Sequence, residues 1–336
     1  MTGIRDNKFD RIKGIAILLV IIGHLAHGIG WTVPIIYTFH MPLFFIVSGY
    51  FYKEKEIIQL FKRDFRTLLI PYFLISFILI IYGFLVTLWK QNPDKVWYWI
   101  NAFIKAGTTD SGLGPLWFLL AMFWCRLFYN LLFKIMTHIT SRPVLYSVLI
   151  SYLLFIGITS APNKMEQINY QCFINGFECM FYFSLGNLAK TYKGKISVPL
   201  NHNVSFIILI TIICVVSIIY SMPHSDLGTF KQHIIFNVLA SSSATYLLYR
   251  LCSNNSRIDK KDFLAWYGRL SLVVFSLHTI MLRILPIDKA FEMILHTSSS
   301  YVINTLTPIF HVVITIIFCW ISERSKILSY LFNIKK

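Results

Sequence analysis

The chain has 336 residues, of which 56% are hydrophobic and only 14% are charged. Soluble domains carry about 25% charged residues, so this composition excludes an ordinary soluble fold and indicates a membrane protein. The net charge of +16 would suit nucleic acid, but the Lys and Arg residues stand in short blocks between apolar runs. Since they do not gather on one recognition element, we expect no nucleic-acid partner.

Apolar runs of the length needed to cross a bilayer, about 20 residues, recur along the whole chain. They predict an all-α, polytopic integral membrane protein with about ten transmembrane helices and a single domain over residues 1–336. Residues 97–107 form a run too short to span, and its aromatic residues suggest a helix at the outer interface. The expected spans are residues 12–29, 34–52, 68–89, 114–136, 143–160, 171–189, 204–222, 232–252, 263–285 and 301–322.

The distribution of positive charge predicts the orientation. With the N-terminus inside, most of the 31 Lys and Arg residues fall in cytoplasmic segments, as the positive-inside rule requires. Asp10 at the start of the first run, and the lack of a small-residue cleavage site, favour a retained span over a signal peptide. We expect a multi-pass protein of the inner (plasma) membrane with both termini in the cytoplasm.

The six cysteines lie mostly inside apolar runs, without the spacing of a metal site or a disulfide framework. We expect them to be buried packing residues, and we expect no metal.

The first two expected spans contain an unusual number of polar groups, which are costly in hydrocarbon and suggest function. On a helix, Lys13 and His24 share one face, roughly 16 Å apart along the axis. A cation at the membrane edge and an imidazole deeper inside would suit a long ligand with an anionic head and a reactive tail. His24 is either a general base, since neutral imidazole has a suitable pKa, or a packing residue bonded to a neighbouring helix. Asp10 and Lys13 can form an ion pair at the helix mouth, with or without a role in binding.

Other polar residues also have both functional and structural interpretations. Pro42 is expected to kink or break the second span, which would let His40 line a pocket or remain a satisfied core histidine. Glu178 could orient a histidine, bind an acceptor or pair with Arg126. Trp117 could stack on a sugar ring, although tryptophan is common at membrane interfaces.

The sequence also resembles the membrane-bound acyltransferase-3 family, whose members O-acylate cell-surface glycans. The resemblance rests on FD-x-x-KG-x-A and GH near the start, then FHMPLFFIVSGYF, Arg63-x-x-Arg66 with LLIPYF, GPLWFLL, FSLGNLAK and YGRLSLVVFSLHT, in family order over nearly the whole length. Lys13 stands where the family usually has arginine.

This resemblance implies an O-acyltransferase that moves an acyl group, expected to be acetyl, from cytoplasmic acetyl-CoA (or another acyl-CoA) to a hydroxyl of an envelope or exported glycan. His24 would be the family's catalytic histidine, taking the proton of a sugar hydroxyl, with Lys13 and Asp10 beside it. Arg63 and Arg66, with Lys13, would bind the phosphates of the donor, although basic residues there also set topology and contact lipid heads. His40, Trp117, Glu178 and His278 are the expected substrate-binding residues; His278 matches a family position. The alternative is a transporter or flippase for a glycan or lipid-linked sugar.

Overall fold

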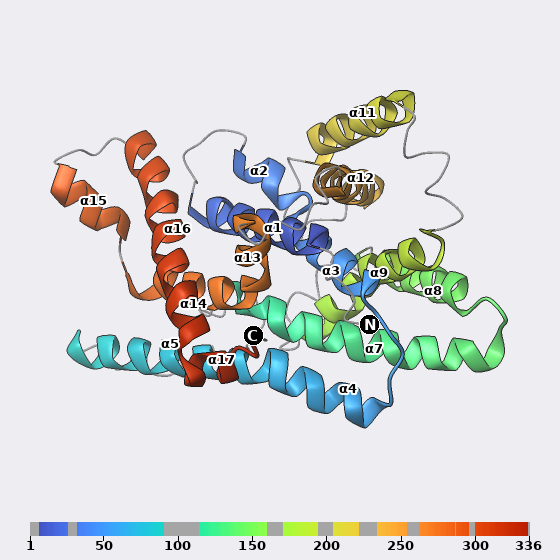
Figure 1. Cartoon of the computed structure of the whole chain (residues 1–336), viewed down its shortest axis with the longest axis horizontal. Coiled ribbons are helices and arrows are strands. Elements are labelled where there is room, and N and C mark those ends of the chain that lie inside the picture. Colours follow the sequence, from blue (N-terminus) through green and yellow to red (C-terminus); the bar gives the residue numbers. More distant parts are fainter. Residues whose placement is uncertain are drawn as a thin grey trace. The chain divides into compact units, whose positions relative to one another are not determined.

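A computed structural model describes residues 7–25, 32–90, 114–159, 171–193, 204–221, 234–253, 262–285, 287–295 and 300–334. Every regular element in these ranges is a helix, which confirms the predicted all-α class (Figure 1). The expected interfacial helix at residues 97–107 lies outside the described residues. The α-helices are α1 (Lys8–Leu25), α2 (Thr32–Tyr37), α3 (His40–Tyr50), α4 (Ile57–Asp64), α5 (Ile70–Trp89), α7 (Trp117–Ile139), α8 (Pro143–Thr159), α9 (Gln171–Thr191), α11 (Val204–Ser221), α12 (Ile234–Ser253), α13 (Phe263–Arg269), α14 (Ser271–Ile284), α15 (Ile287–Leu295), α16 (Ser300–Arg324) and α17 (Lys326–Leu331).

Helices coincide with all ten expected spans, and the polytopic membrane fold is confirmed. Among the described residues, five segments are long and apolar enough to cross a membrane, or six if the bent pair α13 and α14 counts as one span. The other four expected spans fall on helices that are shorter or more polar. Helix α8 has only 17 residues, and α1 carries four charged residues in its first two turns. Helices α9 and α12 carry buried polar residues. The five segments are Thr32–Tyr50, Ile57–Trp89, Gly114–Ile139, Val204–Ser221 and Val302–Arg324.

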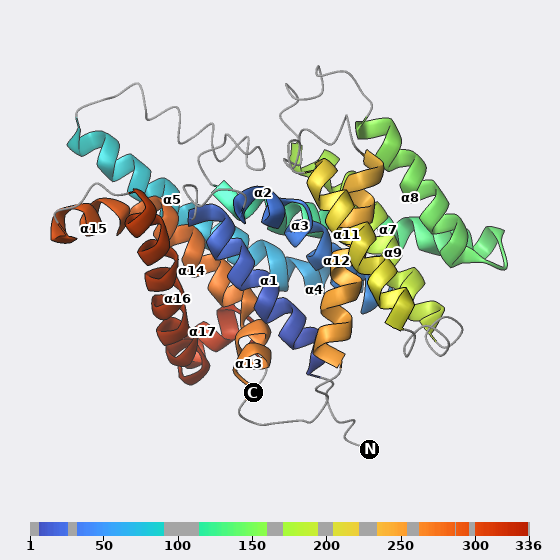
Figure 2. The same ribbon diagram turned by 90° about the horizontal axis from the view of Figure 1, so that it is seen from above.

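The chain divides into two compact units, which are described one at a time. The first unit comprises residues 1–51, 186–275 and 287–321. In it, α1 packs against α2, α3, α12 and α13, and α11 lies along α12 in both views (Figures 1 and 2). The core around α1 consists of apolar side chains from α1, α3 and α12: Phe9, Ile12, Ala16, Leu43, Val47 and Cys252.

The second unit comprises residues 52–185, 276–286 and 322–336. Here α7 packs against α4, α8 and the π-helix Phe65–Leu69, which joins α4 to α5. Stacked aromatic rings join α7 to α9. The ring centroids of Phe128 and Phe177 are 3.9 Å apart, and the ring planes are inclined by only 7°. A 3-10 turn, Gly114–Leu116, leads into α7.

The six cysteines are all buried and none is in a disulfide, as the sequence predicted.

Candidate active site

The ion pair expected at the start of the first helix is present. Nζ of Lys13 lies 2.8 Å from Oδ1 of Asp10, one turn apart on α1. The Asp10 side chain is 5% exposed and the Lys13 side chain 27% exposed. The carboxylate is therefore held inside the protein while the ammonium group keeps access to solvent or to a ligand.

Two glycines explain why Asp10 is buried. Gly14 of α1 faces the backbone carbonyl of Leu264 in α13, and Gly268 of α13 faces the backbone of Asp10 and Gly14. A Cβ atom at either glycine would overlap backbone atoms of the other helix, so only glycine permits this approach. The close contact presses α13 onto the half of α1 that carries Asp10 and Lys13.

A second ion pair joins α1 to the start of α13. Nε of Arg11 pairs with Oδ2 of Asp262, and Nη1 of Arg11 also donates to the carbonyl oxygen of Cys252 at 3.4 Å. Oδ1 of Asp262 accepts a hydrogen bond of 3.1 Å from the backbone N–H of Ala265, so the same carboxylate caps α13. Arg11 was not among the site residues predicted from the sequence.

His24 lies near the other end of α1, and its ring is partly buried. Its Nδ1 lies 3.1 Å from the hydroxyl oxygen of Tyr37, the last residue of α2. The edge of one ring meets the face of the other, with centroids 6.0 Å apart and planes inclined by 88°. Tyr37 was not among the residues predicted from the sequence.

The predicted break in the second span is present, but it lies just before Pro42. The helix stops at Tyr37 and resumes at His40. Proline has no N–H and its ring crowds the carbonyl four residues earlier, which is that of Thr38, so the interruption falls at residues 38–39. Instead, the backbone N–H groups of Thr38 and Phe39 donate to the carbonyl oxygens three residues earlier, those of Ile35 and Ile36, at 3.3 Å each.

His40 stabilises this break. Its Nδ1 lies 2.8 Å from the carbonyl oxygen of Ile36, and because a carbonyl only accepts, Nδ1 carries the proton. The His40 side chain is buried, and its ring makes an edge contact with Tyr37 at 5.0 Å. The structure therefore gives His40 backbone and ring partners; contact with a substrate stays a prediction.

Lys13 and His24 lie on one continuous helix, as expected, but each has its own partner. Lys13 contacts Asp10, and His24 contacts Tyr37. Binding of one long ligand by both residues stays a prediction.

In the second unit, a buried carboxylate lies between two guanidinium groups. Nε of Arg63 donates to Oδ1 of Asp64 at 2.8 Å, and Nε of Arg126 lies 3.1 Å from Oδ2 of Asp64. The Asp64 side chain is 2% exposed, against 36% for Arg63 and 23% for Arg126. The acidic residue thus fixes one cation from α4 and one from α7, and each cation keeps an exposed part.

Arg66 has a different neighbour from Arg63. It lies in the π-helix Phe65–Leu69, and its guanidinium carbon is 4.7 Å from the centre of the Tyr330 ring in α17. A π-helix widens the turn, and such turns are frequent at functional sites. The structure places Arg126 beside Arg63, across Asp64. Joint binding of phosphates by Arg63 and Arg66 stays a prediction.

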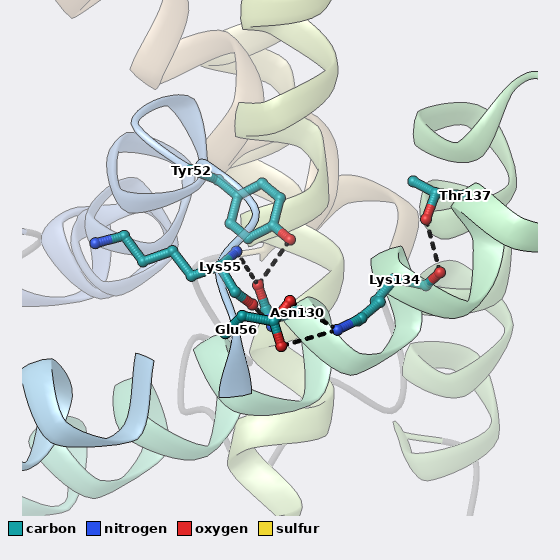
Figure 3. Close-up of polar contacts among 6 residues, drawn as sticks. All are labelled: Tyr52, Lys55, Glu56, Asn130, Lys134 and Thr137. Atoms are coloured by element: carbon teal, nitrogen blue, oxygen red, sulfur yellow. Dashed lines mark hydrogen bonds and ion pairs between the residues drawn. The ribbon is translucent and has the colours of Figure 1, made fainter. Parts of the chain in front are cut away.

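Asn130 of α7 holds the segment that leads into α4 (Figure 3). Its Oδ1 accepts from the Tyr52 hydroxyl at 3.0 Å and from the Lys55 N–H at 3.2 Å, and its Nδ2 donates to the Lys55 carbonyl at 2.9 Å. Burial, with smaller contributions from Tyr129 and Glu54, raises the pKa of Tyr52 above its ordinary value, so the phenol stays protonated and donates. Next to it, Lys134 forms an exposed ion pair with Glu56 at 3.0 Å.

The remaining predicted substrate residues are buried in the second unit. Trp117 opens α7 and is 8% exposed, and its carbonyl oxygen lies 3.5 Å from the thiol of Cys172. Glu178 in α9 is 7% exposed and His278 in α14 is fully buried. Their role in binding an acceptor stays a prediction.

Comparison with known proteins identifies the class. The chain matches the acyltransferase-3 family model, described as an acyltransferase domain, over residues 6–324. This match includes α1 with His24, the α2–α3 break and Asp64 with its two arginines. The family match and the membrane-spanning helices together define the class, a membrane acyltransferase. The chain belongs to the acyltransferase-3 family, and its family implies an acyl donor and an acceptor.

Two similar proteins share a short part of the chain. Nodulation protein NolL of Sinorhizobium fredii is 46% identical over 56 residues, which is 14% of this chain and 15% of that protein. Nodulation protein NolL of Mesorhizobium japonicum is 49% identical over 59 residues, 15% of this chain and 16% of that protein. The matched region thus covers only about a sixth of each relative. No solved structure matches the chain.

Proposed function

We propose that this acyltransferase moves an acetyl group from cytoplasmic acetyl-CoA to a hydroxyl of a cell-envelope or exported glycan. The observation that carries the proposal is the family match over residues 6–324, which includes every residue that we assign. Succinyl or longer acyl groups are alternatives for the donor.

His24 is the proposed general base. Its imidazole takes the proton of the acceptor hydroxyl as the hydroxyl oxygen bonds to the thioester carbonyl carbon. The carbon–sulfur bond then breaks, and the proton passes from the imidazolium to the departing thiolate. The products are an ester on the acceptor and the donor as a free thiol, with His24 back in its starting state.

Lys13 is the proposed cation of the first unit. Its side chain is 27% exposed, and Asp10 holds its ammonium group at 2.8 Å. This group would bind a phosphate or the acyl carbonyl oxygen. As a compact charge, lysine sets the position of an anion less strictly than the paired N–H groups of arginine.

Arg63 and Arg66 are the proposed phosphate-binding residues of the second unit. Arg66 is exposed and the Arg63 side chain is 36% exposed, so both guanidinium groups are accessible to a polyanion. Arginine binds phosphate oxygens through paired N–H groups, which suits the phosphates of coenzyme A. Coenzyme A is a cytoplasmic compound, and the positive charge of these segments predicts that they face the cytoplasm.

The test is mass spectrometry of the surface glycans from cells with and without this chain, with His24→Gln as the third sample. The proposal expects O-acetyl groups only in cells that make the unaltered chain. Acylation confined to cytoplasmic glycans would contradict the proposed acceptor. Unchanged acylation with altered glycan export in His24→Gln would favour a transporter instead.

A further inference from the structure

The hydrogen bond between His24 and Tyr37 raises a question about the imidazole's two nitrogen atoms. Nδ1 lies 3.1 Å from the phenol oxygen. The bond has two forms: the phenol donates to Nδ1, which puts the ring proton on Nε2, or Nδ1–H donates to the phenol oxygen, which leaves the lone pair on Nε2. The two forms give opposite predictions for which nitrogen can accept a proton.

We propose that Tyr37 is a positioning residue that accepts a hydrogen bond from Nδ1–H of His24, so that Nε2 takes the proton of the acceptor hydroxyl. This inference rests on the proposed function. With Nδ1 engaged by Tyr37, a base at Nε2 needs a lone pair on that nitrogen, and an accepting partner at Nδ1 provides for it. A partner that accepts at Nδ1 is compatible with both the neutral ring and the imidazolium formed during transfer, so the ring need not turn between the two steps.

The fold explains why a tyrosine hydroxyl reaches this position. Pro42 ends α2 at Tyr37, and His40 secures that end through the carbonyl of Ile36 at 2.8 Å. The Tyr37 ring is then packed nearly perpendicular to both imidazole rings. Its centroid lies 6.0 Å from that of His24 and 5.0 Å from that of His40. A ring held on two sides places its hydroxyl group in a fixed direction, which is what a positioning residue requires.

Tyr37→Phe removes the hydroxyl and keeps both ring contacts, so it tests the hydrogen bond alone. The assay uses purified protein, radiolabelled acetyl-CoA and the glycan isolated from cells that lack this chain. We expect kcat to fall by about 10- to 100-fold, because the lost bond would be to the charged imidazolium formed during transfer, and such hydrogen bonds are the stronger ones; KM for both substrates should stay unchanged. Tyr50→Phe is the matched control, because Tyr50 lies in the same span and packs against the rings of Phe9 and Phe51; its kcat should stay at the unaltered value.

The outcomes separate this inference from the proposed function. If His24→Gln retains transfer, the assignment of the base fails, whatever Tyr37 does. If His24→Gln is inactive and Tyr37→Phe has unaltered kcat, only the role of Tyr37 is overturned. A rise in KM for the glycan with unchanged kcat would also overturn it, because Tyr37 would then bind substrate.

A second measurement does not depend on turnover. Nitrogen-15 spectra of histidine-labelled protein in lipid nanodiscs, with the His24 signals assigned by their loss in His24→Gln, report which ring nitrogen carries the proton. We expect Nδ1–H in the unaltered protein and loss of that preference in Tyr37→Phe. A proton on Nε2 in the unaltered protein would overturn the proposal.

Discussion

Arg126 and Asp64 form an ion pair between two helices, with Nε of the arginine 3.1 Å from Oδ2 of the carboxylate. Arg63 binds the other oxygen at 2.8 Å, so one buried carboxylate balances two cations. Removing it would leave two positive groups facing each other in a partly buried site.

We therefore expect Asp64→Asn to destabilise the protein by about 1–3 kcal/mol, below the value for a fully buried pair because both arginines are partly exposed. Unfolding can be followed with a thiol-reactive fluorophore, since all six cysteines are buried in the folded protein. The control is Lys134→Met, which removes an exposed ion pair with Glu56, 70% exposed, and should change stability by less than about 1 kcal/mol. Equal effects of the two substitutions would contradict the central role of Asp64.

Gly268→Ala should be strongly destabilising, because the added Cβ would overlap the carbonyl oxygen of Asp10. Overpacking of this kind costs about 1–3 kcal/mol, and any relief must move α13 away from Asp10 and Lys13. Gly157→Ala in α8 is the matched control: nothing lies within 4 Å of its Cβ position, so the helix should gain roughly 0.5–1 kcal/mol. Melting curves of the two variants should shift in opposite directions, and a neutral Gly268→Ala would show that the two helices pack less closely.

Asn130→Ala should destabilise the segment before α4, because it leaves the N–H and carbonyl of Lys55 and the hydroxyl of Tyr52 without this partner. The expected loss is about 1.5–4.5 kcal/mol, because three partly buried hydrogen bonds are lost and each contributes about 0.5–1.5 kcal/mol. Tyr52→Phe breaks one of the three bonds and should cost only about 0.5–1.5 kcal/mol. Protease sensitivity between residues 51 and 56 should rise in Asn130→Ala and stay low in Tyr52→Phe; the reverse order would contradict the role of the amide.

Asp262 has two separable functions, an ion pair with Arg11 and the cap of α13. Asp262→Asn keeps an oxygen that can cap the helix and loses the charge, whereas Asp262→Ala loses both. The Ala variant should therefore be less stable than the Asn variant by about 1 kcal/mol in the same melting assay. Two variants of equal stability would indicate that the cap contributes little.

Sequence patterns predicted what depends on local composition. Apolar length identified the helices of the ten expected spans but not the short helices α4, α15 and α17, which lie outside those spans. Helical spacing predicted the Asp10–Lys13 pair. The Pro42 break was also predictable, although its place before the proline follows from the carbonyl that the ring crowds. The sharp bend of 72° between α13 and α14 was not, since no proline marks it.

The missed partners are those that depend on packing between distant segments. Tyr37 meets His24 only because α2 packs against α1, and no periodicity reveals that contact. The sequence carried one indication that Asp64 forms an ion pair: it is a lone carboxylate between the basic residues Arg63 and Arg66. Its pairing with Arg126, which we had considered as a partner for Glu178, required the packing of α4 against α7.

The π-helix at Phe65–Leu69 also bears on how this chain tolerates length changes during evolution. Such a turn holds one residue more than an α-helical turn, so deleting one residue here would restore regular winding. The widened turn absorbs the extra residue, so the residues before and after it would keep nearly the same facing. A one-codon deletion at this point would therefore leave Asp64 on the side that meets Arg126, whereas the same deletion within α5 would turn Asp64 by about 100° away from that side.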